Sequence, residues 1–268
     1  MRESWDRRIR RSDQLVAAAG PGVSLLTFYA RLLRCQKAVY DTFDHQPPSG
    51  SLDRDMALVR RAALPLLHAV AANGPDQLAQ EARRLVTSVT SDARHDAELD
   101  DLLLAYWQVP AGSPQFFPKA ILQPYAEWLA HAGLAPIDRS VVSGADNRCP
   151  CCGGLPQLSI LEPVTASLLD GGGRRLLCAT CLGTWAFRRV RCAHCGEEDE
   201  HTLGYFHAPE LDHLRVDVCE SCRHYLKTVD LTRLGLAVPL VDEVAGAPLD
   251  AWARDRGYEK IELNLVGL

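Results

Sequence analysis

Apolar residues recur with two different spacings along the chain. From Val23 to about Ala132 they follow a period near 3.6, the spacing that places side chains on one face of a helix. Two runs show it most clearly: Leu25, Leu26, Phe28, Tyr29, Leu32 and Leu33, and Phe116, Phe117, Ala120, Tyr125, Trp128 and Leu129. Further helices are predicted at residues 55–72, 76–89 and 94–107. Five helices with short links predict a bundle, in which Cys35 is interpreted as a small buried hydrophobe.

The helical period stops before residue 149, and short β-rich runs replace it. These runs cover residues 184–190, 202–206 and 214–218. A last helix is predicted from Pro239 to Arg256, ending at Gly257. The predicted fold class is α+β: an N-terminal helical bundle domain, tandem rubredoxin- or zinc-ribbon-like metal-binding units, and a C-terminal helix.

The same change of pattern predicts the domain organisation. Residues 134–148 are rich in Gly, Pro, Ser and Asp, which is typical of a linker. The predicted segments are a helical domain (1–133), the linker (134–148), a first metal unit (149–187), a second metal unit (188–232), and the C-terminal helix and tail (233–268).

The N-terminus carries two arginine pairs, at residues 7–8 and 10–11, before a short apolar stretch at residues 15–19. This order is similar to that of a twin-arginine export signal. Pro21 interrupts the apolar stretch, however, and no small-residue cleavage site follows. The segment is therefore interpreted as a basic leader into a surface helix.

Composition and charge narrow the classes of function. The chain has 29 basic and 34 acidic residues and a net charge of −5, so no global positive field favours nucleic acid or anionic lipid. No run approaches the roughly 18 uncharged apolar residues of a membrane helix. With 47% apolar residues, the chain is expected to be a globular protein without membrane insertion.

Nine of the ten cysteines lie between residues 149 and 222, and eight of them form four Cys-x-x-Cys pairs. The first two pairs are separated by 25 residues and the last two by 23, so one small unit is repeated in tandem. Disulfide scaffolds are usual in short secreted chains, and this chain is neither short nor visibly secreted. Thiolate ligands in a reducing, cytoplasmic compartment are the better interpretation.

A Cys-x-x-Cys pair wraps a metal ion in a tight turn, and two such turns complete a tetrahedral site. Gly153 and Gly196, each directly after a pair, supply the backbone angle that the turn needs. Two ions are predicted, one held by Cys149, Cys152, Cys178 and Cys181 and the other by Cys192, Cys195, Cys219 and Cys222. Zinc and iron both accept four thiolates, and the spacing does not choose between them.

Three residues near the pairs need an interpretation of their own. Cys151 is a third thiol in the first turn, and we interpret it as a spare that points away, with an exchanging or redox-reactive ligand as the alternative. His194 and His224 lie in and just after the third and fourth turns. Because four cysteines already fill each site, both histidines are expected around the sites or at the surface.

No catalytic residue is predicted. A closed four-cysteine site has no open position for substrate, and the chain contains no His-Glu-x-x-His, Gly-x-Ser-x-Gly or phosphate-loop motif. The polar cluster of His207, Glu210, Asp212 and His213 is interpreted as a solvated loop. The chain is therefore expected not to be an enzyme.

The charge of the metal units bears on their partners. Residues 149–225 contain seven arginines and ten acidic residues, a balance of −3 that argues against nucleic acid. A local basic strip is nevertheless expected from Arg174, Arg175, Arg188, Arg189 and Arg191. Protein partners are favoured, and association of the chain with itself is left open.

The cysteine motifs and their flanks resemble the formate dehydrogenase accessory protein FdhE family. The resemblance rests on Cys149 to Gly153, Leu176 to Cys181 with Trp185 following, Arg189 to Cys195, Cys219 to Lys227, Gln123 to Ala126, and the tail from Gly257 to Gly267. It covers chiefly Cys149 to the C-terminus. The chain departs from the family pattern at Cys151 and in its shorter helical half.

The resemblance implies a cytoplasmic maturation factor that binds the catalytic subunit of a formate dehydrogenase before export. It also implies a tandem rubredoxin-like fold with iron on the eight paired cysteines. Two other functions stay open: an electron-transfer protein with two iron tetrathiolates, and a zinc-ribbon module that binds nucleic acid or protein.

Overall fold

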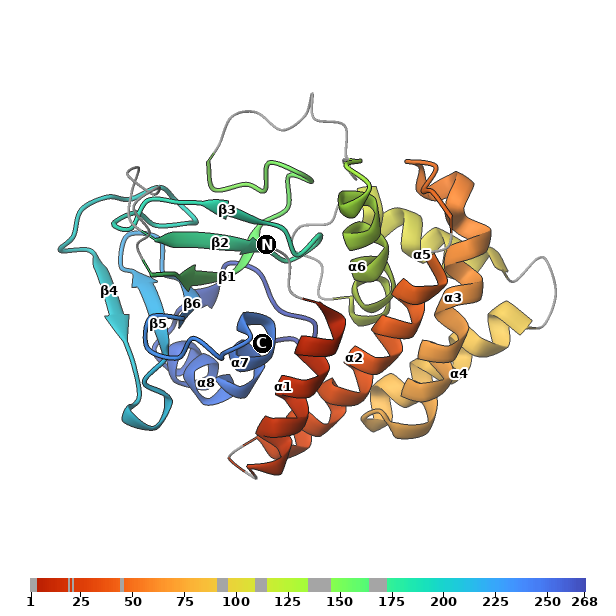
Figure 1. Ribbon diagram of the computed structural model, residues 1–268, viewed down its shortest axis with the longest axis horizontal. Coiled ribbons are helices and arrows are strands. Elements are labelled where there is room, and N and C mark those ends of the chain that lie inside the picture. The colour runs from red at the N-terminus through yellow and green to blue at the C-terminus, as the bar shows by residue number, and fades with distance from the viewer. Residues whose placement is uncertain are drawn as a thin grey trace.

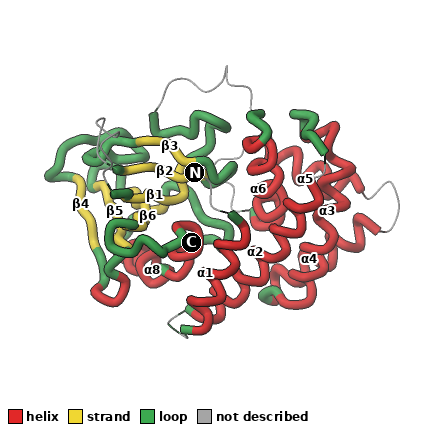
Figure 2. The backbone as a smooth tube through the Cα atoms, viewed as in Figure 1, coloured by secondary structure: helices red, strands yellow, loops and turns green. Residues whose placement is uncertain are grey.

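Six helices lie on one side of the molecule and a sheet lies on the other (Figure 1, Figure 2). The computed structural model describes residues 4–18, 20, 22–43, 46–90, 96–108, 115–134, 146–163 and 173–268. The six helices are α1 (Trp5–Ala17), α2 (Val23–Phe43), α3 (Leu52–Asn73), α4 (Asp76–Thr90), α5 (Asp96–Gln108) and α6 (Phe116–His131). The five helices predicted from the apolar period are all present, as α2 to α6.

Helix α1 corrects part of the interpretation of the basic N-terminus as a leader into a surface helix, because Arg8 of the first arginine pair is buried. Ser4 caps the helix by accepting a hydrogen bond from the Arg7 amide at 3.3 Å. Arg8 is 1% exposed and donates to both carboxylate oxygens of Glu127 on α6, at 2.7 and 3.0 Å. The helix can bury this guanidinium because a carboxylate 119 residues away neutralises it, which the local sequence does not reveal.

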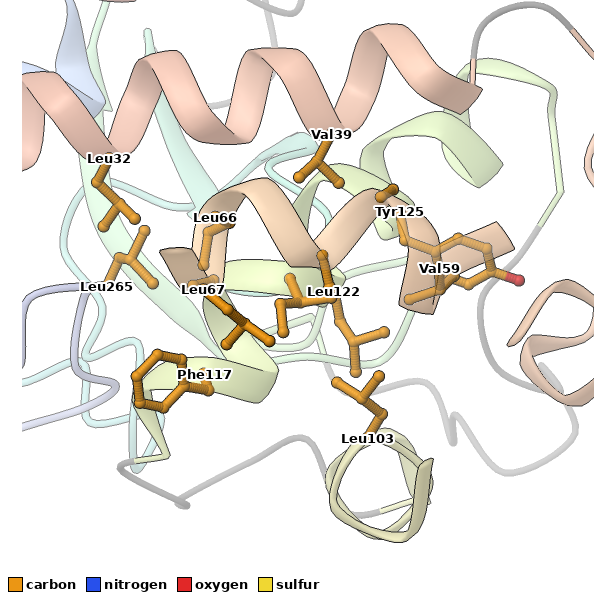
Figure 3. Packing of buried hydrophobic residues seen from close by; sticks show 14 of the residues in the cluster. Leu32, Val39, Val59, Leu66, Leu67, Leu103, Phe117, Leu122, Tyr125 and Leu265 are labelled. Atoms are coloured by element: carbon orange, nitrogen blue, oxygen red, sulfur yellow. The ribbon is translucent and has the colours of Figure 1, made fainter. Parts of the chain in front are cut away.

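The helical core gathers around α6 (Figure 3). Residues from Phe117 to Leu129 of this helix are all buried. Its neighbours in the core come from α2, α3, α5 and the C-terminal tail, and Figure 3 labels Leu32, Val39, Val59, Leu66, Leu67, Leu103, Phe117, Leu122, Tyr125 and Leu265. Because Leu265 packs here, the end of the chain is held against the helical half.

The sheet joins the two repeated units into one layer. Its strands are β1 (Pro156–Leu161), β2 (Arg174–Cys178), β3 (Thr184–Ala186), β4 (Leu203–Phe206), β5 (Leu214–Cys219), β6 (His224–Asp230) and β7 (Glu259–Lys260). The order is β3-β2-β1-β6-β5-β4, with β7 beside β6. Within each unit the strands are antiparallel, whereas β1 and β6 pair in parallel, with Leu158 opposite Lys227. The parallel pair is the seam between the units.

The predicted last helix is two helices, α7 (Pro239–Ala245) and α8 (Ala247–Asp255). The break falls at Gly246, and Pro248, which has no backbone N–H, stands in the first turn of α8. A side chain at Gly246 would lie 2.9 Å from the Leu214 side chain, so glycine lets the helix pair approach β5. Gly257 has φ 76° and ends α8 as predicted.

Buried charges fix the C-terminal segment between the helices and the sheet. Glu243 and Asp250, from α7 and α8, are fully buried and face the ammonium groups of Lys227 and Lys260. Among the described residues, no helix is long and apolar enough to cross a membrane. Residues 135–145, most of the predicted linker, lie outside the described part.

Candidate metal centres

The first cysteine group lies between the sheet and α6. The Cys149 and Cys181 sulfurs are 3.6 Å apart, and those of Cys152 and Cys178 are 3.3 Å apart. All four sulfurs lie within 4.8 Å of one another. A tetrahedral ion with metal–sulfur bonds of about 2.3 Å needs sulfurs about 3.8 Å apart, so this group fits one ion with small adjustments.

The second cysteine group has the same arrangement in the second unit. The Cys192 and Cys222 sulfurs are 3.7 Å apart, as are those of Cys195 and Cys219. These four sulfurs also lie within 4.8 Å of one another. In each group one Cys-x-x-Cys turn precedes the first strand of the unit, and the other joins its second and third strands. Both groups are placed to bind a metal ion.

The backbone of each turn explains the recurring residue after the second cysteine. Gly153 and Gly196 have φ of 72° and 81°, and their amides donate to the carbonyls of Cys149 and Cys192 at 2.8 and 3.1 Å. Leu182 and Arg223, at the same place in the other turns, have φ of 55° and 59°. The prediction that glycine supplies the left-handed backbone angle is therefore confirmed for two turns. In the other two turns, a residue with a side chain adopts the same angle.

The two groups differ in their surroundings. All four cysteines of the first are buried, in a cluster with Ala126 of α6, Trp185 and Ile261. Trp185 also donates its indole N–H to the Asp146 carbonyl at 2.8 Å. In the second group Cys195 is exposed and Cys222 half-buried. The first group is covered by α6 and by the C-terminal segment around Ile261, both outside its own unit. The second group has one face toward solvent.

Burial raises the pKa of the Cys178 thiol and of the Cys192 thiol above the ordinary value. The cause is the cost of a thiolate in a poorly solvated place. A divalent ion reverses this cost, because a coordinating thiol loses its proton to the metal. Two sulfur clusters built in this way are suited to holding a cation.

Cys151 is half-buried, and its side chain packs against the cluster that contains the first cysteine group. It is nevertheless not one of the four sulfurs that lie within 4.8 Å of one another. The extra thiol of the turn Cys149-Pro150-Cys151-Cys152 therefore lies outside the four-sulfur group.

The expected basic strip is only partly present. Arg174 is buried and donates to the carbonyls of Arg188, Arg189 and Arg191, at 3.2, 3.2 and 3.0 Å. Its guanidinium thus holds the loop between the two units instead of facing a partner. Arg188 and Arg189 are exposed, as expected for a basic surface.

The polar cluster near residue 210 divides in the same way. His207, Glu210 and Asp212 are exposed, as predicted for a loop. His213 is mostly buried, and its Nε2 lies 3.0 Å from a carboxylate oxygen of Asp242 on α7. His213 therefore lies in a turn, as predicted, but it is not solvated, because its ring contacts a carboxylate that is distant in sequence.

Comparison with known proteins supports the family resemblance. Residues 190–266 match the family model described as FdhE, C-terminal domain. A protein named Protein FdhE homolog from Aquifex aeolicus is 31% identical over 211 residues, which cover 76% of this chain and 68% of that protein. The chain belongs to the FdhE family. A Protein FdhE homolog from Pseudomonas aeruginosa is 28% identical over 295 residues, with coverage of 98% and 90%.

A solved structure extends the match over the whole chain. The crystal structure of the FdhE protein from Pseudomonas aeruginosa aligns with a TM-score of 0.65 at 25% identity and covers 99% of this chain and 97% of that one. With other relatives the match is partial, covering 56% of a Haemophilus influenzae homolog and 50% of one from Pseudomonas putida. The helical half, where the sequence resemblance is weakest, thus shares the FdhE fold.

Proposed function

We propose that this chain is a maturation protein for a formate dehydrogenase, which binds the catalytic subunit in the cytoplasm and is not itself an enzyme. The observation that carries the proposal is the pair of four-cysteine groups within an FdhE-family fold. Four thiolates fill a tetrahedral ion, so such sites leave no position for substrate. Binding of a protein partner is therefore the favoured role.

The ions of this proposal are iron or zinc, one in each group. The ligands are Cys149, Cys152, Cys178, Cys181, Cys192, Cys195, Cys219 and Cys222. Protein purified without oxygen should contain close to two ions per chain, with iron and zinc counted together. A reproducible value of one, or four iron ions with labile sulfide, would contradict this assignment.

The partner surface is proposed to lie beside the second cysteine group. A cavity of about 260 Å³ there is lined by residues that include Arg189, Arg191, Tyr205 and Cys192. Apolar side chains are unusually open at this place, with Val190 54% exposed and Tyr205 62% exposed. Apolar side chains edged by arginines are typical of surfaces that bind proteins.

Gene deletion and complementation test the function. The deletion strain should lose formate dehydrogenase activity, and the wild-type gene should restore it. A Cys192→Ser/Cys195→Ser variant should fail to restore it and fail to capture the catalytic subunit, whereas Cys35→Ser, outside both groups, should do both. Normal formate oxidation in a deletion strain without another family member would refute the proposal and favour iron-based electron transfer.

The surface is tested separately by reversing one charge. Arg189→Glu should weaken capture of the subunit while the metal content stays at two ions. Arg84→Glu is the matched control, because the Arg84 side chain is 73% exposed on α4, at the far end of the helical side (Figure 1). Equal capture by both variants would exclude the surface around residue 189.

A further inference from the structure

The open face of the second cysteine group carries two histidines. His194 lies inside the turn between Cys192 and Cys195, and His224 follows Cys222 at the start of β6. Their rings stack, with centroids 3.6 Å apart and planes at 10°. The tandem turns thus bring together two imidazoles that are 30 positions apart in sequence, at the solvent side of the site.

Hydrogen bonds fix how these histidines are presented. The Nδ1 of His224 lies 2.8 Å from the Cys222 carbonyl, which can only accept, so Nδ1 donates and Nε2 keeps its lone pair. The backbone of His194 is held on both sides. Its amide donates to the Cys192 sulfur at 3.4 Å, and its carbonyl accepts from the Asn147 side chain at 3.0 Å.

A ring nitrogen of each histidine and the Cys222 sulfur all lie within 4.8 Å of one another. We propose that His194, His224 and the Cys222 thiolate form a third metal-binding set, open to solvent, for a divalent transition-metal ion. Two imidazoles and one thiolate are the donors that Zn²⁺ and Co²⁺ accept. Cys222 belongs to both sets, so both ions would share its sulfur as a ligand.

Binding requires a small movement of the rings. A nitrogen lone pair lies in the plane of its ring, so two parallel rings must tilt before both can face one ion. His194 is exposed and the His224 side chain is 22% exposed, which leaves room for this tilt. The Glu259 carboxylate lies 4.0 Å from the His224 Nε2 and offers an oxygen, and Arg148 is one positive charge that acts on His194. Water or Glu259 completes the fourth position.

Cobalt titration of the full chain tests the third set. The protein is first loaded with zinc, and the solvent-open third set is then cleared with a weak chelator that leaves the closed four-cysteine groups filled. Co²⁺ is then added while visible absorption and released zinc are both measured. The wild-type chain should bind one further equivalent of Co²⁺ with a thiolate-to-cobalt band and no zinc release. His194→Gln/His224→Gln should lose that equivalent and keep its zinc.

A matched variant controls for the loss of two histidines. His201 and His207 are exposed in the same unit, and His201→Gln/His207→Gln should bind cobalt as the wild type does. Cobalt binding that survives in His194→Gln/His224→Gln, or that appears only with equal zinc release, would overturn the third set, as would its absence from the wild type. The result is the difference in bound cobalt between the variant and the wild type. It is therefore independent of how many ions the cysteine groups hold.

Discussion

At the residue scale, the residue after each cysteine pair adopts the left-handed backbone angle of the metal-binding turn. Arg223 has φ 59°, a value that costs a side chain free energy because its Cβ approaches the carbonyl. Its guanidinium partly offsets this cost, because it pairs with Glu220 and packs over the Tyr258 ring at 4.0 Å. An arginine therefore stands where two other turns use glycine.

Two substitutions at this position separate the backbone from the side chain. Arg223→Ala and Arg223→Gly lose the same contacts, but only glycine adopts the left-handed angle without strain. We expect Arg223→Gly to be more stable than Arg223→Ala by about 1 kcal/mol. Denaturant unfolding of the metal-loaded proteins measures the difference. A more stable alanine variant would show that the turn is not strained.

The Arg8–Glu127 pair is a second residue-scale device, because both side chains are 1% exposed. Glu127→Ala would leave the guanidinium buried without its partner and should lower the free energy of unfolding by roughly 3 kcal/mol or more. Asp13→Ala is the control, since Asp13 and Arg34 form a pair that is 50% and 48% exposed and is worth about 1 kcal/mol or less. If denaturant unfolding showed the same loss of unfolding free energy for Glu127→Ala and Asp13→Ala, burial would not be what makes the Arg8–Glu127 pair important.

Glu243 links stability to pH. Burial would raise its pKa, but Lys227 and Lys260 outweigh that effect and hold the pKa at about 2, below the ordinary 4.5. A carboxyl with a lowered folded-state pKa adds stability above its unfolded pKa and loses it as the pH falls toward the folded pKa. The unfolding free energy should therefore fall between pH 4.5 and about 2, and the fall should be shallower in Glu243→Gln.

Acid also releases metal from thiolates, and this contribution is common to both proteins. The difference between their unfolding curves thus isolates Glu243. Glu210→Gln, at an exposed position, should follow the wild type. If the unfolding free energy of all three proteins fell with pH in parallel, Glu243 would not be the cause of the loss of stability in acid.

At the element scale, the break between α7 and α8 determines how the C-terminal segment packs on the sheet. Gly246 has φ −77°, so its backbone is open to any residue, and contact alone excludes a side chain. An added Cβ would lie 2.9 Å from the Leu214 side chain and 3.3 Å from the Glu243 carbonyl. The glycine therefore allows the close approach of the α7–α8 break and β5.

Gly246→Ala should therefore destabilise the protein by about 1–3 kcal/mol through overpacking. Gly235→Ala is the matched control, because the nearest atom to its Cβ would be the Leu231 carbonyl oxygen at an ordinary 3.7 Å. That control should change stability by about 0.5 kcal/mol or less. Thermal or denaturant unfolding compares them, and a neutral Gly246→Ala would mean that the helix pair shifts without cost.

At the scale of the whole molecule, the first cysteine group lies where the helical half meets the sheet. Gln123 of α6 donates to the Ala179 carbonyl at 3.1 Å, and Ala126 packs in the same cluster as Cys178. None of the four cysteines of the second group belongs to this cluster, which includes only Ala193 from their first turn. Loss of metal from the first group should therefore also destabilise α6, which lies outside its own unit.

Cys178→Ser should lose the first ion, unfold the C-terminal half and increase hydrogen exchange in α6, while the signal of the remaining helices stays largely intact. Cys195→Ser should lose the second ion and leave α6 protected. Metal analysis and hydrogen exchange on both variants measure these effects. Native-like protection of α6 and protease resistance in Cys178→Ser would rule out a structural role for the first group.

The sequence by itself determined the five helices α2 to α6 and the grouping of the eight cysteines. Both follow from short-range patterns: the apolar period specifies a helix face, and Cys-x-x-Cys with a following glycine specifies a turn. Each relationship spans only a few residues, so it can be read without knowing the fold.

Only the tertiary structure decided the features that depend on partners distant in the chain. Arg8 is buried because Glu127 lies opposite it, His213 is drawn inward by Asp242, and the last helix breaks where Gly246 meets Leu214. The stacked histidines belong to the same class, since two turns had to fold before their rings could meet. Long-range packing and electrostatics set these contacts, and no local pattern encodes them.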